Sequence, residues 1–330
     1  MAIYLDESRL ASCIVRWARE GLATFAVLIS VVGCARTSNQ PAVPAVPPAV
    51  LSAPATANHP PMSNLEDTYE EVLSASDVTF DDAFEKLKAE LPQFEGDFIT
   101  EGDLLRTEEQ LRHDVEALRR DRLLRASGHT PQVAIGPELV AALRPNGASD
   151  LWPEGNRTLT YSIDLKSFKD PKQAALVEQH IKEAVADWEA ICTAGQKCGL
   201  SFVFRPDTKP THKTNTFIVR RVNANGAFIA AAFFPSYPSA RRFVNIDPSF
   251  FTTAYDKTGV LRHEVGHVLG YRHEHIRDIL GCRQEGTHWL PITPYDAHSV
   301  MHYMCGGGGT LSLRLTDIDK QGHVKAYGGE

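Results

Sequence analysis

The sequence has no excess of basic residues and only one long apolar run, and both shortages exclude classes of protein. Its 34 lysines and arginines against 41 aspartates and glutamates give a formal charge of −7, so it lacks the basic footprint of a nucleic-acid-binding protein. A single apolar run cannot supply the spans of a polytopic membrane protein. With 43% apolar and 23% charged residues in 330, the composition is that of a globular protein, which excludes wholesale disorder and collagen-like repeats.

The charge is spread unevenly along the chain. Residues 63–128 contain 18 acidic and 8 basic side chains, a net charge of −10, whereas residues 129–330 contain 20 acidic and 22 basic ones, a net charge of +2. The length allows one large domain with appendages. An acidic segment therefore precedes a larger C-terminal region that is close to neutral.

The apolar run at residues 21–33 is typical of a signal peptide. At about 13 residues it is too short for a transmembrane helix, which needs about 20, and Arg16 and Arg19 lie just before it. The run ends in Val-Val-Gly-Cys, which resembles the bacterial lipoprotein box, where the cysteine is lipidated and becomes the mature N-terminus. We therefore expect residues 1–34 to be a lipoprotein signal peptide and Cys34 to anchor an exported protein to a membrane of the bacterial cell envelope, the outer membrane or cell surface. The alternative is an ordinary secretory signal with an incidental cysteine.

Two segments separate this signal from the C-terminal region. Residues 35–62 read as a linker, because positions 40–62 contain seven prolines and no charged side chain and would form an extended spacer. Residues 63–144 form the acidic segment, with helical periodicity over 65–92 and 105–126. Between those two helices the triplet Glu-Gly-Asp occurs twice, ending at Asp97 and at Asp103. The simplest interpretation is a solvated helical spacer whose Gly-Asp pairs are turns.

Residues 263–274 have the sequence His-Glu-Val-Gly-His-Val-Leu-Gly-Tyr-Arg-His-Glu. His263 and His267 are four residues apart, so both imidazoles leave one face of a helix and can bind the same metal ion. Glu264 then lies beside the open coordination position. Gly270 can adopt a positive φ and end the helix, which lets the chain turn back and bring His273 to the same ion. Three protein nitrogens plus a water is the catalytic form of zinc.

A second motif agrees with the first. Ser299-Val300-Met301-His302-Tyr303 follows, with Met301 lying 28 residues after His273. The two motifs together resemble those of the metzincin zinc metallopeptidases, the astacins in particular. Residues 151–163, 172–191 and 316–327 resemble, more loosely, the first strand, first long helix and closing helix of that family. The spacing between the motifs is shorter than is usual in astacins, so bacterial metzincins outside the astacins are the alternative.

The resemblance implies a fold, a cofactor and roles for individual residues. It implies an α+β peptidase domain over residues 145–330, with a twisted mixed sheet, an active-site helix and a small C-terminal subdomain. One Zn²⁺ per chain would be held by His263, His267 and His273, with Glu264 as general base. Met301 would pack beneath the metal, and Tyr303 would be a mobile fifth ligand that stabilises the oxyanion.

The same resemblance gives the acidic segment a second interpretation. Astacin prosegments resemble Phe-x-Gly-Asp, whose aspartate replaces the catalytic water on zinc and keeps the enzyme latent. Residues 94–97 fit that pattern, which makes Asp97 a candidate latency switch, and Asp103 is its competitor. Residues 63–144 would then be an inhibitory prosegment that is cleaved off between Ser127 and Asp150. The comparison also implies that Glu274 meets the new N-terminus.

The remaining cysteines and the strand patterns complete the expectations. Cys192, Cys198, Cys282 and Cys305 allow three pairings in an exported domain, of which we favour Cys192–Cys198 and Cys282–Cys305; free buried thiols are the alternative. Strand patterns occur at 158–165, 201–205, 215–222, 227–234 and 242–246. The run at 227–234 fits either a substrate-binding edge strand or a buried central strand.

These observations favour a membrane-anchored zinc endopeptidase that is made as a zymogen and hydrolyses proteins or peptides. The alternative is a zinc-binding lipoprotein that acts in binding or assembly without turnover. The presence of Glu264 argues for the enzyme, because binding alone does not need that carboxylate.

Overall fold

The computed structural model describes residues 62–127, 139–144, 147–192, 198–207, 209–276, 279–282 and 289–328. All of them belong to one unit, Ser52–Glu330. The predicted signal peptide with Cys34 and the linker up to residue 61 lie outside the described residues. Among the described residues, no helix has both the length and the apolar character needed to cross a membrane.

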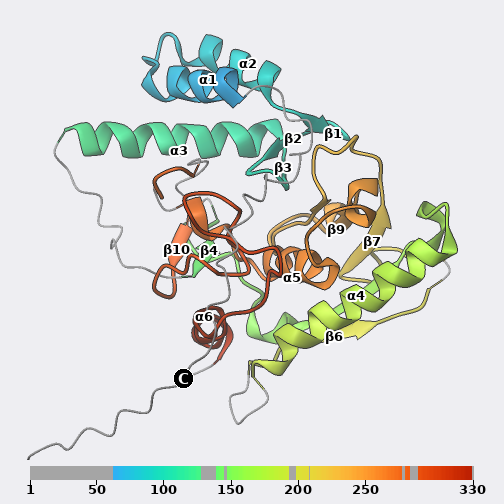
Figure 1. The fold of residues 1–330 in the computed structure, drawn as a ribbon. Helices are drawn as coiled ribbons and strands as arrows, with labels where there is room; N and C mark the ends of the chain where they lie inside the picture. The colour runs from blue at the N-terminus through green and yellow to red at the C-terminus, as the bar shows by residue number, and fades with distance from the viewer. Residues whose placement is uncertain are drawn as a thin grey trace, which may run out of the picture. The chain divides into compact units, whose positions relative to one another are not determined.

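The C-terminal region is built on a mixed five-stranded sheet with the strand order β6-β5-β7-β9-β8 (Figure 1). Four strands are parallel: β5 (Thr158–Ile163), β6 (Ser201–Phe204), β7 (Phe217–Arg221) and β9 (Phe243–Ile246). β8 (Ala230–Ala231) pairs with β9 in antiparallel fashion and ends the sheet. The strand predicted at 227–234 is therefore too long: its apolar residues are mostly buried, but only Ala230 and Ala231 pair with β9.

Two helices pack against each other beside this sheet, α4 (Pro171–Ala190) and α5 (Lys257–Val268). Asp170 caps α4, and Pro171, whose missing N–H has no partner to lose at a helix start, is its first residue. Asp256 caps α5 through the N–H of Gly259. Every α5 residue from Thr258 to Val268 is buried, so the helix runs through the core rather than over it.

The C-terminal part closes around the end of α5. It comprises β10 (Trp289–Pro291) and α6 (Asp317–Tyr327), which begins with a capping box made by Thr316 and Asp319. Short 3₁₀ turns lie at Glu154–Asn156, Leu165–Ser167, Ser239–Arg241, Pro248–Phe251 and Glu274–Ile276. The α+β class predicted from the sequence is confirmed.

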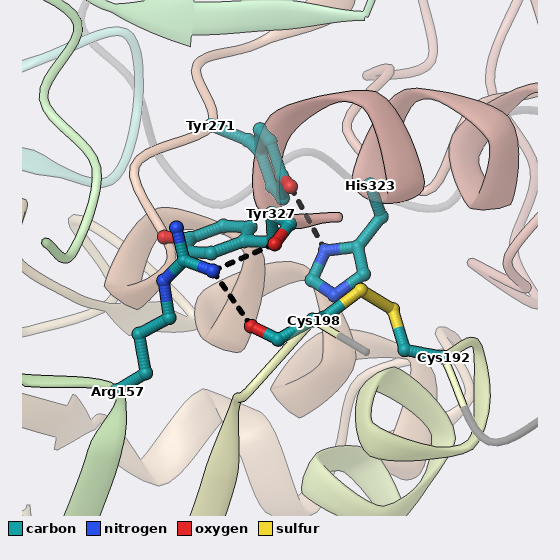
Figure 2. Close-up of a disulfide and its surroundings, with 6 residues drawn as sticks. All are labelled: Arg157, Cys192, Cys198, Tyr271, His323 and Tyr327. Carbon is teal, nitrogen blue, oxygen red and sulfur yellow. Dashed lines mark hydrogen bonds between the residues drawn. A yellow bond between two sulfur atoms is a disulfide. The ribbon is translucent and has the colours of Figure 1, made fainter. Parts of the chain in front are cut away.

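Both favoured cysteine pairings are present. Cys192–Cys198 ties the end of α4 to the start of β6, and Cys282–Cys305 ties the chain after α5 to the segment after Met301. Figure 2 shows the first disulfide beside α6: Arg157 donates to the carbonyl oxygens of Cys198 (2.8 Å) and Tyr327 (2.6 Å). The disulfide is thus joined to the closing helix.

The sequence pattern predicted a helical acidic segment, but the structure contains strands there as well as helices. Its helices are α1 (Met62–Ser74), α2 (Phe80–Glu90) and α3 (Glu108–Ala126), so the pattern at 65–92 is two helices. Between α2 and α3 lie three antiparallel strands, β1 (Gln93–Phe94), β2 (Asp97–Thr100) and β3 (Leu104–Arg106). Leu105 and Arg106, the first two residues of the helix predicted at 105–126, belong with Leu104 to β3. Strand pairing with β2 overrides their local periodicity.

The predicted boundary between residues 144 and 145 leaves a strand that packs with the C-terminal region on the side of the acidic segment. β4 (Val140–Ala142) pairs with β10, and Leu139 and Ala142 are buried in the same core as α4 and α5. Removing this strand would uncover the edge of β10 and part of that core. A division of the chain that keeps this core whole would have to lie before Leu139.

Candidate metal centre

Three histidine side chains meet at the end of α5. His263 and His267 come from one face of the helix, and Gly270, with φ = +94°, ends the helix as predicted and returns the chain to His273. The Nε2 atom of His273 lies 3.1 Å from Nε2 of His263 and 3.1 Å from Nε2 of His267. All three rings are buried. The helical spacing and the turn thus bring together the three residues predicted to bind metal.

The opposite ring nitrogens orient the imidazoles. Nδ1 of His263 donates to the carbonyl oxygen of Val300 at 2.7 Å, and Nδ1 of His267 donates to the carbonyl oxygen of Tyr271 at 2.7 Å. Because a carbonyl only accepts, these bonds place the proton of each neutral ring on Nδ1 and leave the Nε2 lone pair for a metal. Burial lowers the pKa of His267 to about 4, despite the opposing effect of Asp103, so this ring is in the neutral form that ligation requires.

The fourth group at this point is Asp103, which belongs to the acidic segment. Its carboxylate oxygens lie 3.3 Å from Nε2 of His263, 3.5 Å from Nε2 of His267 and 3.3 Å from Nε2 of His273. The hydroxyl group of Tyr303 donates a hydrogen bond to the same carboxylate. Burial alone would raise the pKa of Asp103, but the neighbouring histidines hold it well below its usual range.

The other candidate, Asp97, lies elsewhere and forms an ion pair with Arg241. The two Glu-Gly-Asp triplets differ in what they do to the backbone. Glu95 and Gly96, with φ of 49° and 87°, are the two central residues of a turn that joins paired Phe94 and Asp97, so the first triplet is a hairpin turn. The second lies in a three-residue loop between β2 and β3, and this loop carries Asp103 into the histidines.

Glycine at position 102 is required by the approach of this loop to Tyr303. Gly102 has φ = +88°, and a Cβ atom there would lie 3.0 Å from the Tyr303 ring. The glycine therefore lets the backbone come close enough for the next residue to reach the site.

The donor set fits a zinc ion. Tetrahedral coordination at about 2.0–2.1 Å from nitrogen separates neighbouring donors by roughly 3.3 Å. The distances of 3.1–3.5 Å among the histidine nitrogens and the Asp103 oxygens agree with this geometry. Within the described part of the chain, Oδ1 of Asp103 is buried without a hydrogen-bond partner, as expected of an oxygen that coordinates a cation. The four residues could hold a metal ion.

Glu264 lies next to this group, as predicted, and is 2% exposed. Its Oε2 atom is buried and has no hydrogen-bond partner among the residues that the structure describes. Burial, and then the negative charge of Asp103, raise the pKa of Glu264 well above its usual range. A buried carboxyl group with an unused oxygen is costly in a fold, so it points to a role in chemistry.

Met301 and Tyr303 lie on either side of the histidines. Met301 is fully buried against α5, where a Cβ atom added to Gly266 would lie 2.4 Å from its sulfur. The turn that carries it is held by Asp319, which accepts bonds from Ser299 and from the Val300 N–H. The ring of Tyr303 stacks on His263 at 5.6 Å between centroids.

Several residues of this centre were not predicted from the sequence. Glu101 is buried and pairs with Arg272, and its Oε2 lies 3.3 Å from Nδ1 of His273. His275 is buried and stacks on His273 and Tyr303. Glu274, which the family resemblance predicted to meet the new N-terminus, accepts the N–H of Asp296 at 3.0 Å in the intact chain. The repeated triplet was the available signal for Glu101, since it places a carboxylate two residues before Asp103.

No protein-family model matches the chain, and no curated protein matches it. The interpretation of the site therefore depends on its own geometry and on the motifs.

Proposed function

We propose that the protein is a zinc-dependent endopeptidase of the metzincin type, made in a latent form. The observation that carries the proposal is the convergence of three histidine nitrogens next to the buried carboxyl of Glu264, whose Oε2 has no hydrogen-bond partner in the described part of the chain. A structural zinc site needs four protein ligands and no such neighbour. The mixed sheet and the buried Met301, which packs against Gly266 between the two helical histidines, support the metzincin assignment.

The chain's own residues supply the proton transfers. A bound zinc ion would polarise a water molecule and the carbonyl group of the scissile peptide bond. Glu264 would accept the proton of the attacking water and deliver it to the leaving amine. Tyr303, released from Asp103, would donate a hydrogen bond to the oxyanion that develops at the carbonyl.

Latency follows from the position of Asp103. A carboxylate at the fourth position leaves no room there for water, and Tyr303 is held by the same group. We therefore assign the latency switch to Asp103 rather than Asp97. Activation requires that β1–β3 leave the site, which a cut between Ser127 and Leu139 would allow. A cut after Leu139 would fall in or beyond β4, which belongs to the C-terminal core.

A metal-binding protein without turnover is the competing function, and the fourth protein ligand favours it for the intact chain. A peptide assay of the processed chain separates the two. Wild type should cleave fluorogenic peptides, and Glu264→Gln should lose at least about a hundredfold in kcat/KM while keeping its zinc. Equal activity of the two proteins would exclude the proposed mechanism. No cleavage by a zinc-loaded, processed wild type would leave the binding function.

We further propose that Cys34 carries a lipid that anchors the protein to a bacterial envelope membrane. The lipoprotein-like sequence before Cys34 and the proline-rich linker after it support this proposal. Cys34→Ala should move the protein from the membrane fraction to the soluble fraction with unchanged activity. Wild-type protein without lipid mass on Cys34 would contradict it.

A further inference from the structure

Two arginines of the C-terminal region bind carboxylates of the acidic segment outside the metal centre. Arg220 on β7 pairs with Glu95 at 2.6 Å, and Arg241 pairs with Asp97. In both ion pairs the cation lies on the region that processing would retain, and the anion lies on the segment that would leave. Processing would thus expose two positive charges.

Arg220 is held in place by its own region. Its Nε donates to Oδ1 of Asn245 at 2.7 Å, and Asn245 is 2% exposed. Its guanidinium lies 3.8 Å from the centre of the Phe243 ring, a cation–π contact. Because neither contact involves the acidic segment, the guanidinium would keep its position after Glu95 had left. A pre-organised cation binds an anion at little cost in side-chain ordering.

The two arginines line a cavity beside the path of the inhibitory loop. The cavity has a volume of about 300 Å³, and its walls include Glu95, Asp97, Arg220, Arg241, Phe243 and Asn245. Strand β3 passes next to it, with Leu104 forming a parallel bridge to Ala232, just beyond edge strand β8. An extended peptide that added itself to this edge would run along the same path.

We infer that Arg220 and Arg241 form a subsite that selects substrates with an acidic side chain away from the cleaved bond. The inference depends on the proposed peptidase function and adds the substrate class: acidic segments of proteins or peptides. Phe98 pairs with Arg106, so Asp97 lies beside Arg106 and Thr107, which follow Asp103 by three and four positions. We expect the preferred acidic position about three to four residues from the cleaved bond, since side chains paired across strands are neighbours.

The full-length protein is produced first and is then cleaved between Ser127 and Leu139. The test uses the C-terminal product after the N-terminal piece has been removed. Fluorogenic peptides carry one glutamate at successive positions, and each has a partner with glutamine there. Wild type should prefer glutamate over glutamine at one position by about tenfold in kcat/KM, as for a charge-assisted hydrogen bond. The preference should shrink as salt is added.

The double variant Arg220→Gln, Arg241→Gln should cleave both peptides of a pair at similar rates and should cleave glutamine peptides like wild type. The matched control is Arg205→Gln, Lys209→Gln, which removes two exposed charges just after β6, at the other edge of the sheet, and should keep the preference. If the double variant does not fold, the single variant Arg241→Gln is the substitute, because Arg241 lies in a short 3₁₀ turn rather than in a strand. It should reduce the preference for glutamate over glutamine severalfold.

Equal rates for glutamate and glutamine at every position would overturn the inference while leaving the peptidase function intact. So would a preference that survives in the double variant. If no peptide is cleaved, the proposed function has failed, and fluorescence anisotropy with the same labelled peptides decides the subsite. Tighter binding of glutamate peptides by wild type than by the double variant would support it, and equal binding would exclude it.

Discussion

Replacing Asp103 by alanine in the intact chain should release peptidase activity, whereas replacing Asp97 should not. Asp103 is 5% exposed and contacts three histidine nitrogens at 3.3–3.5 Å as well as the Tyr303 hydroxyl. Asp97 makes one ion pair, in which both side chains are partly exposed. Each aspartate ends a Glu-Gly-Asp triplet, so the two variants are a matched comparison.

The expected magnitudes differ accordingly. A buried hydrogen bond to a charged group contributes about 1.5–3 kcal/mol, and the contact with the metal adds to this. Loss of about 3 kcal/mol would shift the equilibrium between closed and open sites by roughly a hundredfold. A partly exposed ion pair contributes up to about 1 kcal/mol, which is at most about fivefold. Activity of the intact chain should therefore rise by about two orders of magnitude in Asp103→Ala and by less than about fivefold in Asp97→Ala.

The assay is hydrolysis of a fluorogenic peptide by intact wild type and both variants, with cleavage of the chain itself followed on gels. Processed forms of all three proteins provide the control, since neither aspartate remains on the processed domain and their activities should be equal. The reasoning is refuted if Asp97→Ala activates more than Asp103→Ala. It is also refuted if intact wild type is as active as its processed form.

Two further predictions concern stability. Gly266→Ala should lower the free energy of unfolding by about 1–3 kcal/mol in urea titrations, because its Cβ would overlap the buried Met301 sulfur. Gly155→Ala, which has open space around it, should not lower it, and equal losses in the two variants would contradict the packing. Burial lowers the pKa of His323 to about 3 from 6.5, so below about pH 6.5 the unfolded chain binds a proton at this residue that the folded chain does not. The free energy of unfolding should therefore decrease as the pH is lowered, by up to about 1.4 kcal/mol per pH unit. His323→Gln should remove that part of the slope of unfolding free energy between about pH 6 and pH 4, and an unchanged slope would show that His323 does not contribute.

The metal centre could be predicted from the sequence because its main determinants are local. His263 and His267 are fixed by helical spacing, and the return of the chain to His273 needs only a residue that tolerates positive φ, which Gly270 provides. The same reasoning could not choose between Asp97 and Asp103. Pairing of β1 with β2 turns the first triplet into a hairpin, and this pairing is a contact between strands that the triplet's own residues do not reveal.

Short strands explain most of the errors. β4 has three residues and β8 has two, too few for an alternating pattern to be recognised. β4 is also separated in sequence from its partner β10, so nothing near residue 140 indicated that it belongs to the C-terminal core. Leu104 and Leu105 fit a helical pattern, but tertiary pairing placed them in β3.

The most direct test of the account is the zinc content of purified full-length protein, measured by mass spectrometry of the metal for wild type and His267→Ala. His267 contributes one of the three buried Nε2 atoms, and its removal from the intact chain leaves two histidines and the Asp103 carboxylate, one donor short of a tetrahedral protein site. Wild type should carry one zinc per chain, and His267→Ala should carry almost none while still folding. A variant with full zinc occupancy, or a wild type that binds no zinc, would contradict the central claim.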